Sequence, residues 1–188
     1  GSYPGMMAAW SRMKYPHLFH GSISSSAPVQ AILDFEGYNN VVAGSMADPV
    51  VGGSATCLLN IQEAFAEVGT KLKTASGRSD LRSSFGLCDK STLEGDGDAQ
   101  LFAESLMMVF PLQSNDPSCA GQYCNYAKLC DLFHNSTSEQ PIDHLASLLG
   151  FFMKQWDMDC LDIDHAQEIK DLQSPDNQDR SWLWQTCT

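Results

Sequence analysis

The first five residues, Gly-Ser-Tyr-Pro-Gly, suggest the most specific chemistry in the sequence. A serine among small residues directly before a helix is typical of a nucleophile elbow, where a tight turn presents the hydroxyl oxygen to a substrate carbonyl. The next residue then donates its backbone N–H to the developing oxyanion. The pattern therefore predicts Ser2 as a nucleophile and the Tyr3 N–H as an oxyanion donor. Pro4 stands where the pattern expects its second glycine, which comes one position later, at Gly5. The energetic cost is small, because proline is tolerated in the first turn of a helix.

Two other interpretations of this segment compete with the elbow. Gly-Ser at a chain start is a common cloning remnant, and a serine N-cap uses the same residues. A serine nucleophile also needs a base. His17 and His20 follow Ser2 too closely to fold back onto it, and we expect solvated or structural roles for the other three histidines, His134, His144 and His165.

A second candidate site has metal-ligand spacing. Cys119, Cys124, Cys130 and His134 follow the pattern C-x4-C-x5-C-x3-H, which approaches a Cys3His zinc module. Against zinc, Asn135 directly follows the histidine and begins an Asn-Ser-Thr glycosylation sequon, which is typical of a secreted loop. We therefore expect disulfides here, glycosylation at Asn135 and no metal.

A run of aspartates suggests calcium, but it lacks the glycine and the terminal glutamate of an EF-hand loop. Cys160 and Leu161 also interrupt it. We expect a solvated helix terminus, because carboxylates are favoured near the N-terminus of a helix. The run consists of Asp157, Asp159, Asp162 and Asp164.

The elements that position these residues divide the chain in two. Residues 1–28 are predicted as a turn, a helix over 6–15, a buried strand over 18–24 and a loop, the unit of a parallel α/β sheet. From Val29 on the periodicity is helical, with apolar stripes over 57–72 behind an N-cap at Ser54 and over 142–156. Weaker helices are predicted over 31–46, 79–87, 98–110, 121–134 and 164–172.

Charge divides the chain at nearly the same place. The 188 residues carry a net charge of −12, yet no Asp or Glu precedes Asp34. Residues 1–33 therefore carry +2, and the rest carry 23 acids against 9 bases. Such an acidic chain does not favour binding to nucleic acid or an anionic membrane.

Composition excludes further classes of protein. A hydrophobic share of 43% is too high for a disordered acidic tail, and no apolar run approaches the ~18 residues of a membrane span. Seven cysteines and a sequon indicate an oxidising compartment. The chain has neither an initiator Met nor a signal peptide, so we expect an internal fragment.

Two separated motifs carry a resemblance to a known family. Residues 1–28 resemble a nucleophile region with the elbow G-G-S-Y-x-G, and residues 182–188, WLWQTCT, resemble W-x-[YW]-Q-x-C-T. On these motifs the chain resembles the lysosomal Pro-Xaa carboxypeptidase family of serine peptidases. That family includes prolyl carboxypeptidase, dipeptidyl peptidase II and thymus-specific serine protease, and the stretches 29–35, 38–39 and 64–68 are most similar to the thymus-specific branch.

The resemblance implies an α/β-hydrolase fragment, with nucleophile elbow, helix and one strand, followed by a mostly α-helical, disulfide-linked cap. It implies that residues 1–28 are part of the catalytic domain and that residues 29–188 form the cap, running back toward the hydrolase domain at its C-terminal end. Ser2 and Tyr3 take the family's nucleophile and oxyanion roles, without a cofactor. The family's Asp and His follow residue 188, so we expect the isolated chain to be inactive.

The implied activity is that of a serine exopeptidase acting on peptides with proline or a small residue next to the scissile bond. Either carboxypeptidase or dipeptidyl peptidase action fits, in a lysosomal, endosomal or secreted protein, and a homodimer is compatible with it. Met6, Trp182 and Trp184 are candidates for an apolar substrate pocket, with core packing as the alternative. For Met7, Trp10 and Trp156 core packing is at least as well supported.

The resemblance also implies disulfides. It pairs Cys57 with Cys130 and Cys88 with Cys160, which leaves Cys119 and Cys124, for which we predict a bond across a short loop. Cys187 is expected to pair outside this chain. Two other identities stay open: a non-catalytic, disulfide-bonded helical binding module of saposin-like character, and an inactive member of the family.

Overall fold

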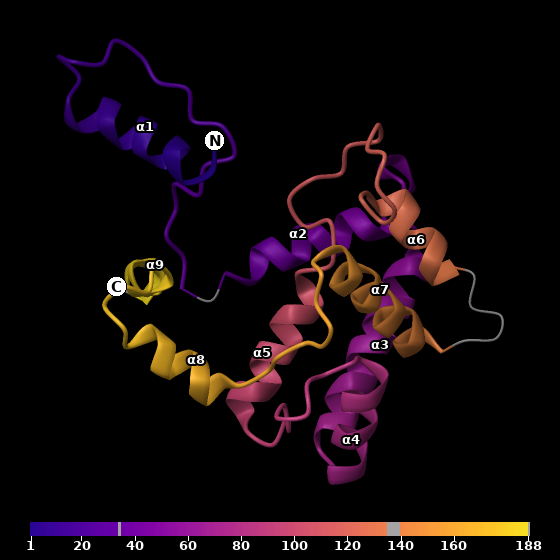
Figure 1. The fold of residues 1–188 in the computed structure, drawn as a ribbon. Helices are drawn as coiled ribbons and strands as arrows, with labels where there is room; N and C mark the ends of the chain where they lie inside the picture. Colours follow the sequence, from indigo (N-terminus) through magenta and orange to yellow (C-terminus); the bar gives the residue numbers. More distant parts are fainter. Residues whose placement is uncertain (34, 135–139, 188) are drawn as a thin grey trace. The chain divides into compact units, whose positions relative to one another are not determined.

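The computed structural model describes residues 1–33, 35–134 and 140–187. These residues form two compact units, Gly1–Asn40 and Val41–Thr188. Figure 1 shows the helices of both units. Within the described ranges the regular structure is helical, and no helix is long and apolar enough to cross a bilayer.

The first unit is built on helix α1, Ser2–Lys14, and the irregular segment that follows it. The expected strand over residues 18–24 is wrong: this segment is not a strand, and its apolar side chains are exposed, Ile23 by 89%. A strand exists only by hydrogen bonding to a neighbour. The described part of the chain offers it no neighbouring strand, so the α/β unit expected over residues 1–28 is not found among the described residues.

Helix α2, Glu36–Ala47, contains the boundary between the units. The second unit continues through a 3-10 turn at Pro49–Val51 and then seven helices within its described residues. These are α3 (Ala55–Leu72), α4 (Ala75–Ser84), α5 (Asp96–Met107), α6 (Tyr126–His134), α7 (Pro141–Gln155), α8 (His165–Leu172) and α9 (Asp179–Cys187).

Helix α3 organises the core of the second unit, because it packs against α4, α6 and α7. Its buried side chains recur every three or four residues, at Cys57, Ile61, Ala64 and Val68, as the apolar stripe predicts. The predicted cap is confirmed: the Ser54 hydroxyl accepts a hydrogen bond from the Cys57 N–H at 3.0 Å. The second predicted stripe forms α7, with Ile142, Leu145, Leu148, Leu149 and Met153 buried.

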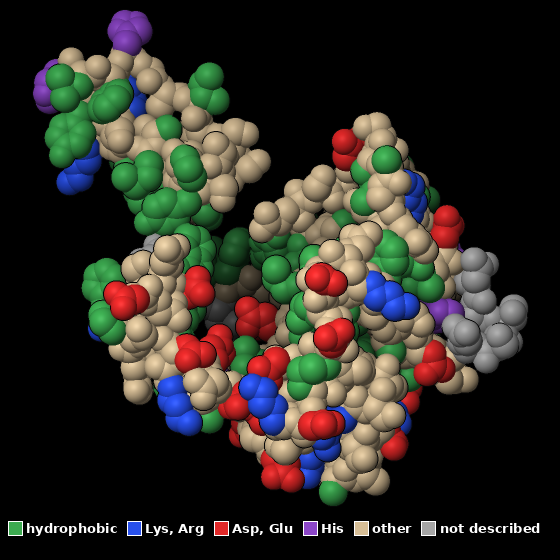
Figure 2. All heavy atoms as spheres, in the orientation of Figure 1, with side chains coloured by type: hydrophobic (Ala, Val, Ile, Leu, Met, Phe, Trp, Pro, Cys, Tyr) green, Lys and Arg blue, Asp and Glu red, His purple; other side chains and the backbone are tan. Residues whose placement is uncertain are grey.

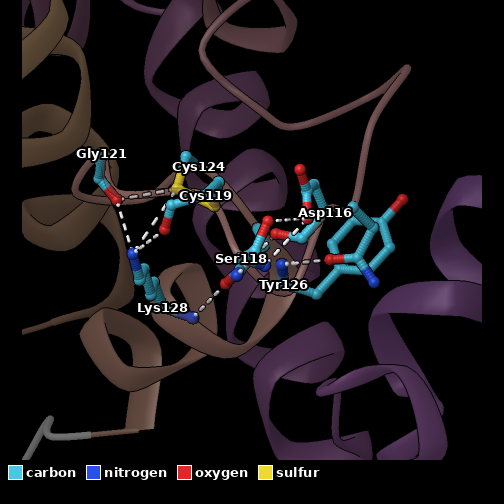
Figure 3. The surroundings of a disulfide bond; sticks show 9 residues. Asp116, Ser118, Cys119, Gly121, Cys124, Tyr126 and Lys128 are labelled. Atoms are coloured by element: carbon cyan, nitrogen blue, oxygen red, sulfur yellow. Dashed lines mark hydrogen bonds between the residues drawn. A yellow bond between two sulfur atoms is a disulfide. The ribbon is translucent and has the colours of Figure 1, made fainter.

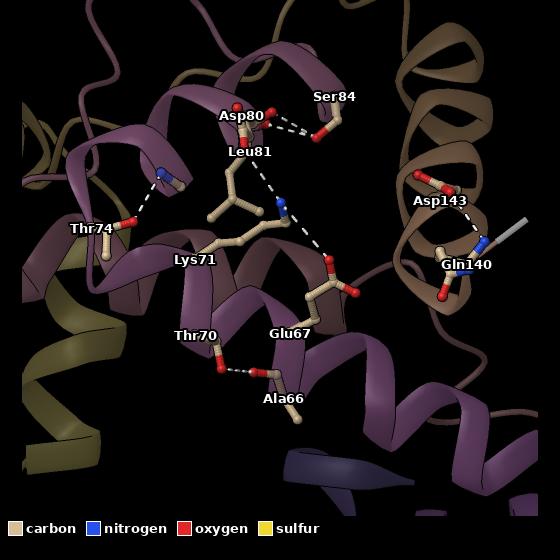
Figure 4. A network of polar contacts seen from close by, with 11 residues as sticks. Ala66, Glu67, Thr70, Lys71, Thr74, Asp80, Leu81, Ser84, Gln140 and Asp143 are labelled. Carbon is tan, nitrogen blue, oxygen red and sulfur yellow. Dashed lines mark hydrogen bonds and ion pairs between the residues drawn. The ribbon is translucent and has the colours of Figure 1, made fainter.

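Polar contacts hold α4 against the end of α3 (Figure 4). The Thr74 hydroxyl caps α4 by accepting from the Gly77 N–H at 3.0 Å, and Lys71 lies between Glu67 and Asp80, 3.8 and 3.4 Å from their carboxylate oxygens. Gly77 permits this approach, because a Cβ there would lie 2.2 Å from the carbonyl oxygen of Lys71.

Three disulfides close the second unit. Cys57–Cys130 joins α3 to α6, Cys88–Cys160 joins the segments that follow α4 and α7, and Cys119–Cys124 closes a loop before α6. The first two are the pairings that the family resemblance implies, and the third is the bond predicted across a short loop. The first two span 73 and 72 residues, and closing loops of that size stabilises a fold by roughly 4 kcal/mol each.

Candidate active-site serine

The turn at Ser2 has an uncommon backbone conformation. Its φ of 54° lies in the left-handed region, which a residue with a side chain occupies only when its surroundings hold it there. Helix α1 begins at this residue, and its N-cap is Gly1 without a side-chain cap bond. The structure therefore places Gly1, not Ser2, at the N-cap position that the alternative of an ordinary serine N-cap requires.

The segment 24–27 holds this turn from one side. The Ser2 N–H donates to the carbonyl oxygen of Ser25 at 3.1 Å, and the Ser24 hydroxyl donates to the carbonyl oxygen of Gly5 at 2.8 Å. A Cβ at Gly5 would meet that same Ser25 oxygen at 3.0 Å and the Ala27 Cβ at 2.9 Å. Gly5 therefore permits the close approach of helix α1 to residues 24–27.

Tyr3, the oxyanion donor that the elbow pattern predicts beside Ser2, lies with it in the first turn of α1. The amide groups of a first turn point out of the helix N-terminus, where anionic oxygen is favoured. The Tyr3 N–H is one of these amides, and the Tyr3 side chain is exposed. The Met6 side chain is buried, with 7% of its surface exposed.

No hydrogen bond joins Ser2 to a histidine among residues 1–33, 35–134 and 140–187. His17 and His20 are exposed in the first unit. In the second unit His144 is buried, with its ring in a T-shaped arrangement with that of Phe133, and the backbone N–H of His165 donates to Asp98. These observations agree with solvated or structural roles.

The remaining pocket candidates lie in the second unit. Trp182 and Trp184 are exposed on α9, a helix that the sequence did not predict. Trp182 and Leu183 line a hollow of about 530 Å³, together with acidic side chains that include Asp171 and Asp179. Met7, Trp10 and Trp156 are 49%, 41% and 48% exposed, so core packing is wrong for all three.

The comparison with family models covers the whole chain. Residues 1–188 match the family described as serine carboxypeptidase S28. The chain belongs to this family of serine peptidases. The turn at Ser2, the helix behind it and the disulfide-bonded helical unit are therefore parts of an S28 sequence.

Curated relatives extend this result. The chain is 33% identical to thymus-specific serine protease of Homo sapiens and to that of Mus musculus, over its full length and 38% of theirs. It is 30% identical to lysosomal Pro-X carboxypeptidase of Bos taurus, over 61% of the chain and 24% of that protein. The chain thus spans less than half the length of these S28 relatives.

Two aspartates of the run in this S28 chain make local contacts that stabilise the fold. The Asp164 carboxylate caps α8 by accepting from the Gln167 N–H at 2.9 Å, which confirms the helix terminus expected there. Asp162 pairs with Lys90 at 2.8 Å. That hydrogen bond, and then the charge of Asp162, raise the pKa of the Lys90 ammonium above its ordinary value.

The cysteines of the zinc pattern are all in disulfides. Cys119 bonds to Cys124 and Cys130 bonds to Cys57, so none of them offers the thiolate that zinc binds. The His134 Nε2 lies 2.5 Å from the Ser54 hydroxyl oxygen. Asn135, the expected glycosylation site, lies outside the described residues.

Sequence reasoning missed one group of contacts in this region. The Lys128 ammonium reaches the carbonyl oxygens of Cys119 and Gly121 and the sulfur of Cys124. The signal that could have revealed it is spacing, because Lys128 follows Cys124 by four residues within the helix predicted over 121–134.

Proposed function

We propose that this chain is part of a serine exopeptidase in which Ser2 is the nucleophile. The observation that carries the proposal is the left-handed φ of 54° at Ser2, at the first residue of a helix and inside an S28 match. A nucleophile elbow needs this combination, since the strained turn holds the hydroxyl away from the backbone and places the helix N-terminus behind it.

In the proposed reaction the Ser2 oxygen attacks a peptide carbonyl while its proton passes to a histidine. The acid and base of the triad are placed after residue 188 in the longer protein, in the order Ser, Asp, His. The Tyr3 N–H stabilises the tetrahedral oxyanion, and water then hydrolyses the acyl-enzyme. No metal or organic cofactor enters these steps.

Residues 1–28 are proposed as part of the catalytic domain and residues 29–188 as the cap. The helical, disulfide-bonded character of the second unit supports a cap. A cap that covers one end of the cleft gives exopeptidase action. Met6, Trp182 and Trp184 are proposed to contribute to an apolar substrate pocket.

The substrate class follows from the relatives. One relative is named for cleavage at Pro-X bonds and for the lysosome, so we propose peptides with proline or a small residue beside the scissile bond. Three disulfides are typical of proteins that fold in the secretory pathway. A lysosomal, endosomal or secreted location is proposed on that basis.

A fluorophosphonate probe on the full-length protein tests the nucleophile. We expect labelling and peptidase activity to disappear in Ser2→Ala and to persist in Ser22→Ala, an exposed serine of the same unit. Labelling that survives in Ser2→Ala would overturn the assignment. Proline-containing peptides blocked at either the amino or the carboxyl end then separate carboxypeptidase from dipeptidyl peptidase action.

A further inference from the structure

The loop between α5 and α6 contains a disulfide unlike the other two. Cys119 and Cys124 are only five residues apart (Figure 3), whereas the other two disulfides span 73 and 72 residues. Cys119 and Cys124 are half-buried, as are Cys88 and Cys160, whereas Cys57 and Cys130 are fully buried. A thiolate must reach a sulfur atom along the S–S axis to exchange with it, so burial disfavours exchange at Cys57–Cys130, and the surroundings of each half-buried bond decide between the other two.

Lys128 places a positive charge beside one sulfur of this bond. Its Nζ donates to the carbonyl oxygens of Cys119 and Gly121 at 2.5 and 3.0 Å and lies 3.7 Å from the Cys124 Sγ. An adjacent ammonium stabilises a cysteine thiolate. Cys124 is therefore the better leaving group when the bond opens, since a disulfide breaks fastest toward its more stable thiolate.

The carbonyl oxygen of Gly121 adds a second difference between the two redox states. It lies 2.7 Å from the Cys124 Sγ. An oxidised sulfur has no proton to donate to this oxygen, whereas a reduced thiol donates one. The contact thus becomes a hydrogen bond only after reduction and protonation of Cys124.

The ends of the loop are held without the disulfide. The Asn115 side chain accepts from the Tyr126 N–H at 2.8 Å and donates to the Val51 carbonyl oxygen at 2.9 Å. Next to this contact, the Asn125 amide donates to the Asp116 carbonyl oxygen at 3.2 Å, so two hydrogen bonds join the start of the loop to its end. Opening the bond therefore releases the loop between these anchors and leaves α6 attached to the core.

The loop also forms part of the wall of an apolar cavity. Tyr123 and Cys124 line a hollow of about 410 Å³ with Phe110 and Phe152, and the Tyr123 ring packs edge-on against Phe151. Tyr123 has a φ of 58°, a conformation that a tight loop holds in place. Release of the loop allows Tyr123 to leave this conformation. The Tyr123 side chain can then move away from the cavity wall.

We propose that Cys119–Cys124 is a thiol-exchange site for low-molecular-weight thiols and that its opening remodels this cavity wall. A thiolate RS⁻ attacks the Cys119 sulfur, forming the mixed disulfide Cys119–S–SR and releasing the Cys124 thiolate beside Lys128. A second RS⁻ takes the R–S group from Cys119 as RSSR. Cys119 and Cys124 then each take up a proton and become thiols. The two electrons that the protein gains come from the two RS⁻ ions, which leave as RSSR.

Differential alkylation of the full-length, oxidised protein in graded glutathione buffers tests the proposal. Free thiols are blocked with iodoacetamide and each cysteine peptide is quantified by mass spectrometry. We expect Cys119 and Cys124 to be alkylated at least tenfold faster than the cysteines of the other two disulfides, with the trapped glutathione adduct on Cys119. Simultaneous opening of all three bonds, or an adduct only on Cys124, would overturn it.

A charge-removing variant tests the role of Lys128. Lys128→Gln keeps a hydrogen-bond donor and should slow the opening of Cys119–Cys124 by about 3- to 10-fold, because the thiolate loses its ammonium. Lys73→Gln, at an exposed lysine on the end of α3, is the matched control and should leave the rate unchanged. An unchanged rate in Lys128→Gln would remove Lys128 from the mechanism.

The cavity wall is tested separately. Cys119→Ser/Cys124→Ser keeps the side-chain size and should keep the helical circular dichroism signal, since the loop ends stay anchored. Amide hydrogen exchange should rise at least tenfold between residues 117 and 124 in this variant and stay unchanged in α3 and α7. Protection that persists across the loop would show that the bond does not control the wall.

Discussion

The two units of this chain bury their hydrophobic residues to very different degrees. The first unit carries its large apolar side chains mostly on its surface, as Figure 2 shows, while the second encloses a continuous core of aliphatic and aromatic residues and holds all three disulfides. A unit stabilises itself only by the apolar area that it removes from water. We therefore expect the second unit to fold by itself and the first unit to be unstable on its own.

The largest expected effect separates the units physically. Residues 41–188, expressed in an oxidising compartment, should unfold in one cooperative thermal transition. Residues 1–40 should show little helix by circular dichroism, because about 40 residues without a disulfide or a closed core do not reach a stable fold. A stable helix α1 in the isolated 1–40 fragment would contradict the comparison.

Removing a long-range disulfide should give the next largest effect within the second unit. Cys57→Ser/Cys130→Ser should lower the free energy of unfolding by about 4 kcal/mol, because a loop of 73 residues is no longer closed in the unfolded chain. Cys119→Ser/Cys124→Ser removes the closure of a far shorter loop and should cost about half as much. Urea denaturation followed by far-ultraviolet circular dichroism measures both; equal losses would argue against a purely entropic origin.

Packing between α3 and α4 gives a smaller effect. Gly77→Ala should destabilise the second unit by about 1 to 3 kcal/mol through overpacking, since the new Cβ would lie 2.2 Å from the Lys71 carbonyl oxygen. Gly69→Ala is the control, because nothing lies within 4 Å of a Cβ there. It should stabilise helix α3 slightly, and thermal melts of the two variants should shift in opposite directions.

The cap of α3 should contribute less. Ser54→Ala removes the acceptor of the Cys57 N–H and should cost about 1 kcal/mol. Ser54→Asp restores an N-cap acceptor and should recover most of the loss, as chemical denaturation would show. A loss that Asp does not recover would point to the contact between Ser54 and His134 as the source of the stability.

The smallest effect concerns pH. The hydrogen bond and charge of Asp162 raise the pKa of Lys90 in the folded chain, so the stabilisation is fully present below the unfolded pKa of the lysine. It disappears as pH rises through the higher folded pKa. Lys90→Met should therefore reduce stability slightly at neutral pH and have no effect at strongly alkaline pH. A loss that is independent of pH would assign the effect to packing instead.

The sequence predicted the second unit well because its signals are local. The stripes of α3 and α7 and the Ser54 cap depend on residues three or four apart, and each formed where it was expected. The strand over 18–24 depends on partners far from it in sequence, which no periodicity within the segment can supply. Helix α9 was missed because its apolar residues are consecutive and give no helical stripe.

The candidate site shows the same division. The residues Gly1 to Gly5 predicted a tight turn before a helix, and the structure has one. Sequence could not choose between an N-cap serine and a nucleophile turn, because both use the same residue types. The structure adds the positive φ of Ser2 and its bond to the Ser25 carbonyl oxygen, and this bond involves a segment about 20 residues further along the chain that no local pattern contains.

The two long disulfides overlap along the chain. One encloses residues 57–130 and the other residues 88–160, so every peptide bond between Cys57 and Cys160 lies inside at least one covalent ring. Hydrolysis of a single bond in this stretch, for example in the exposed loop before α6, opens a ring without separating the pieces. For a protein of a peptidase family, the second unit can therefore be nicked once and still remain one molecule.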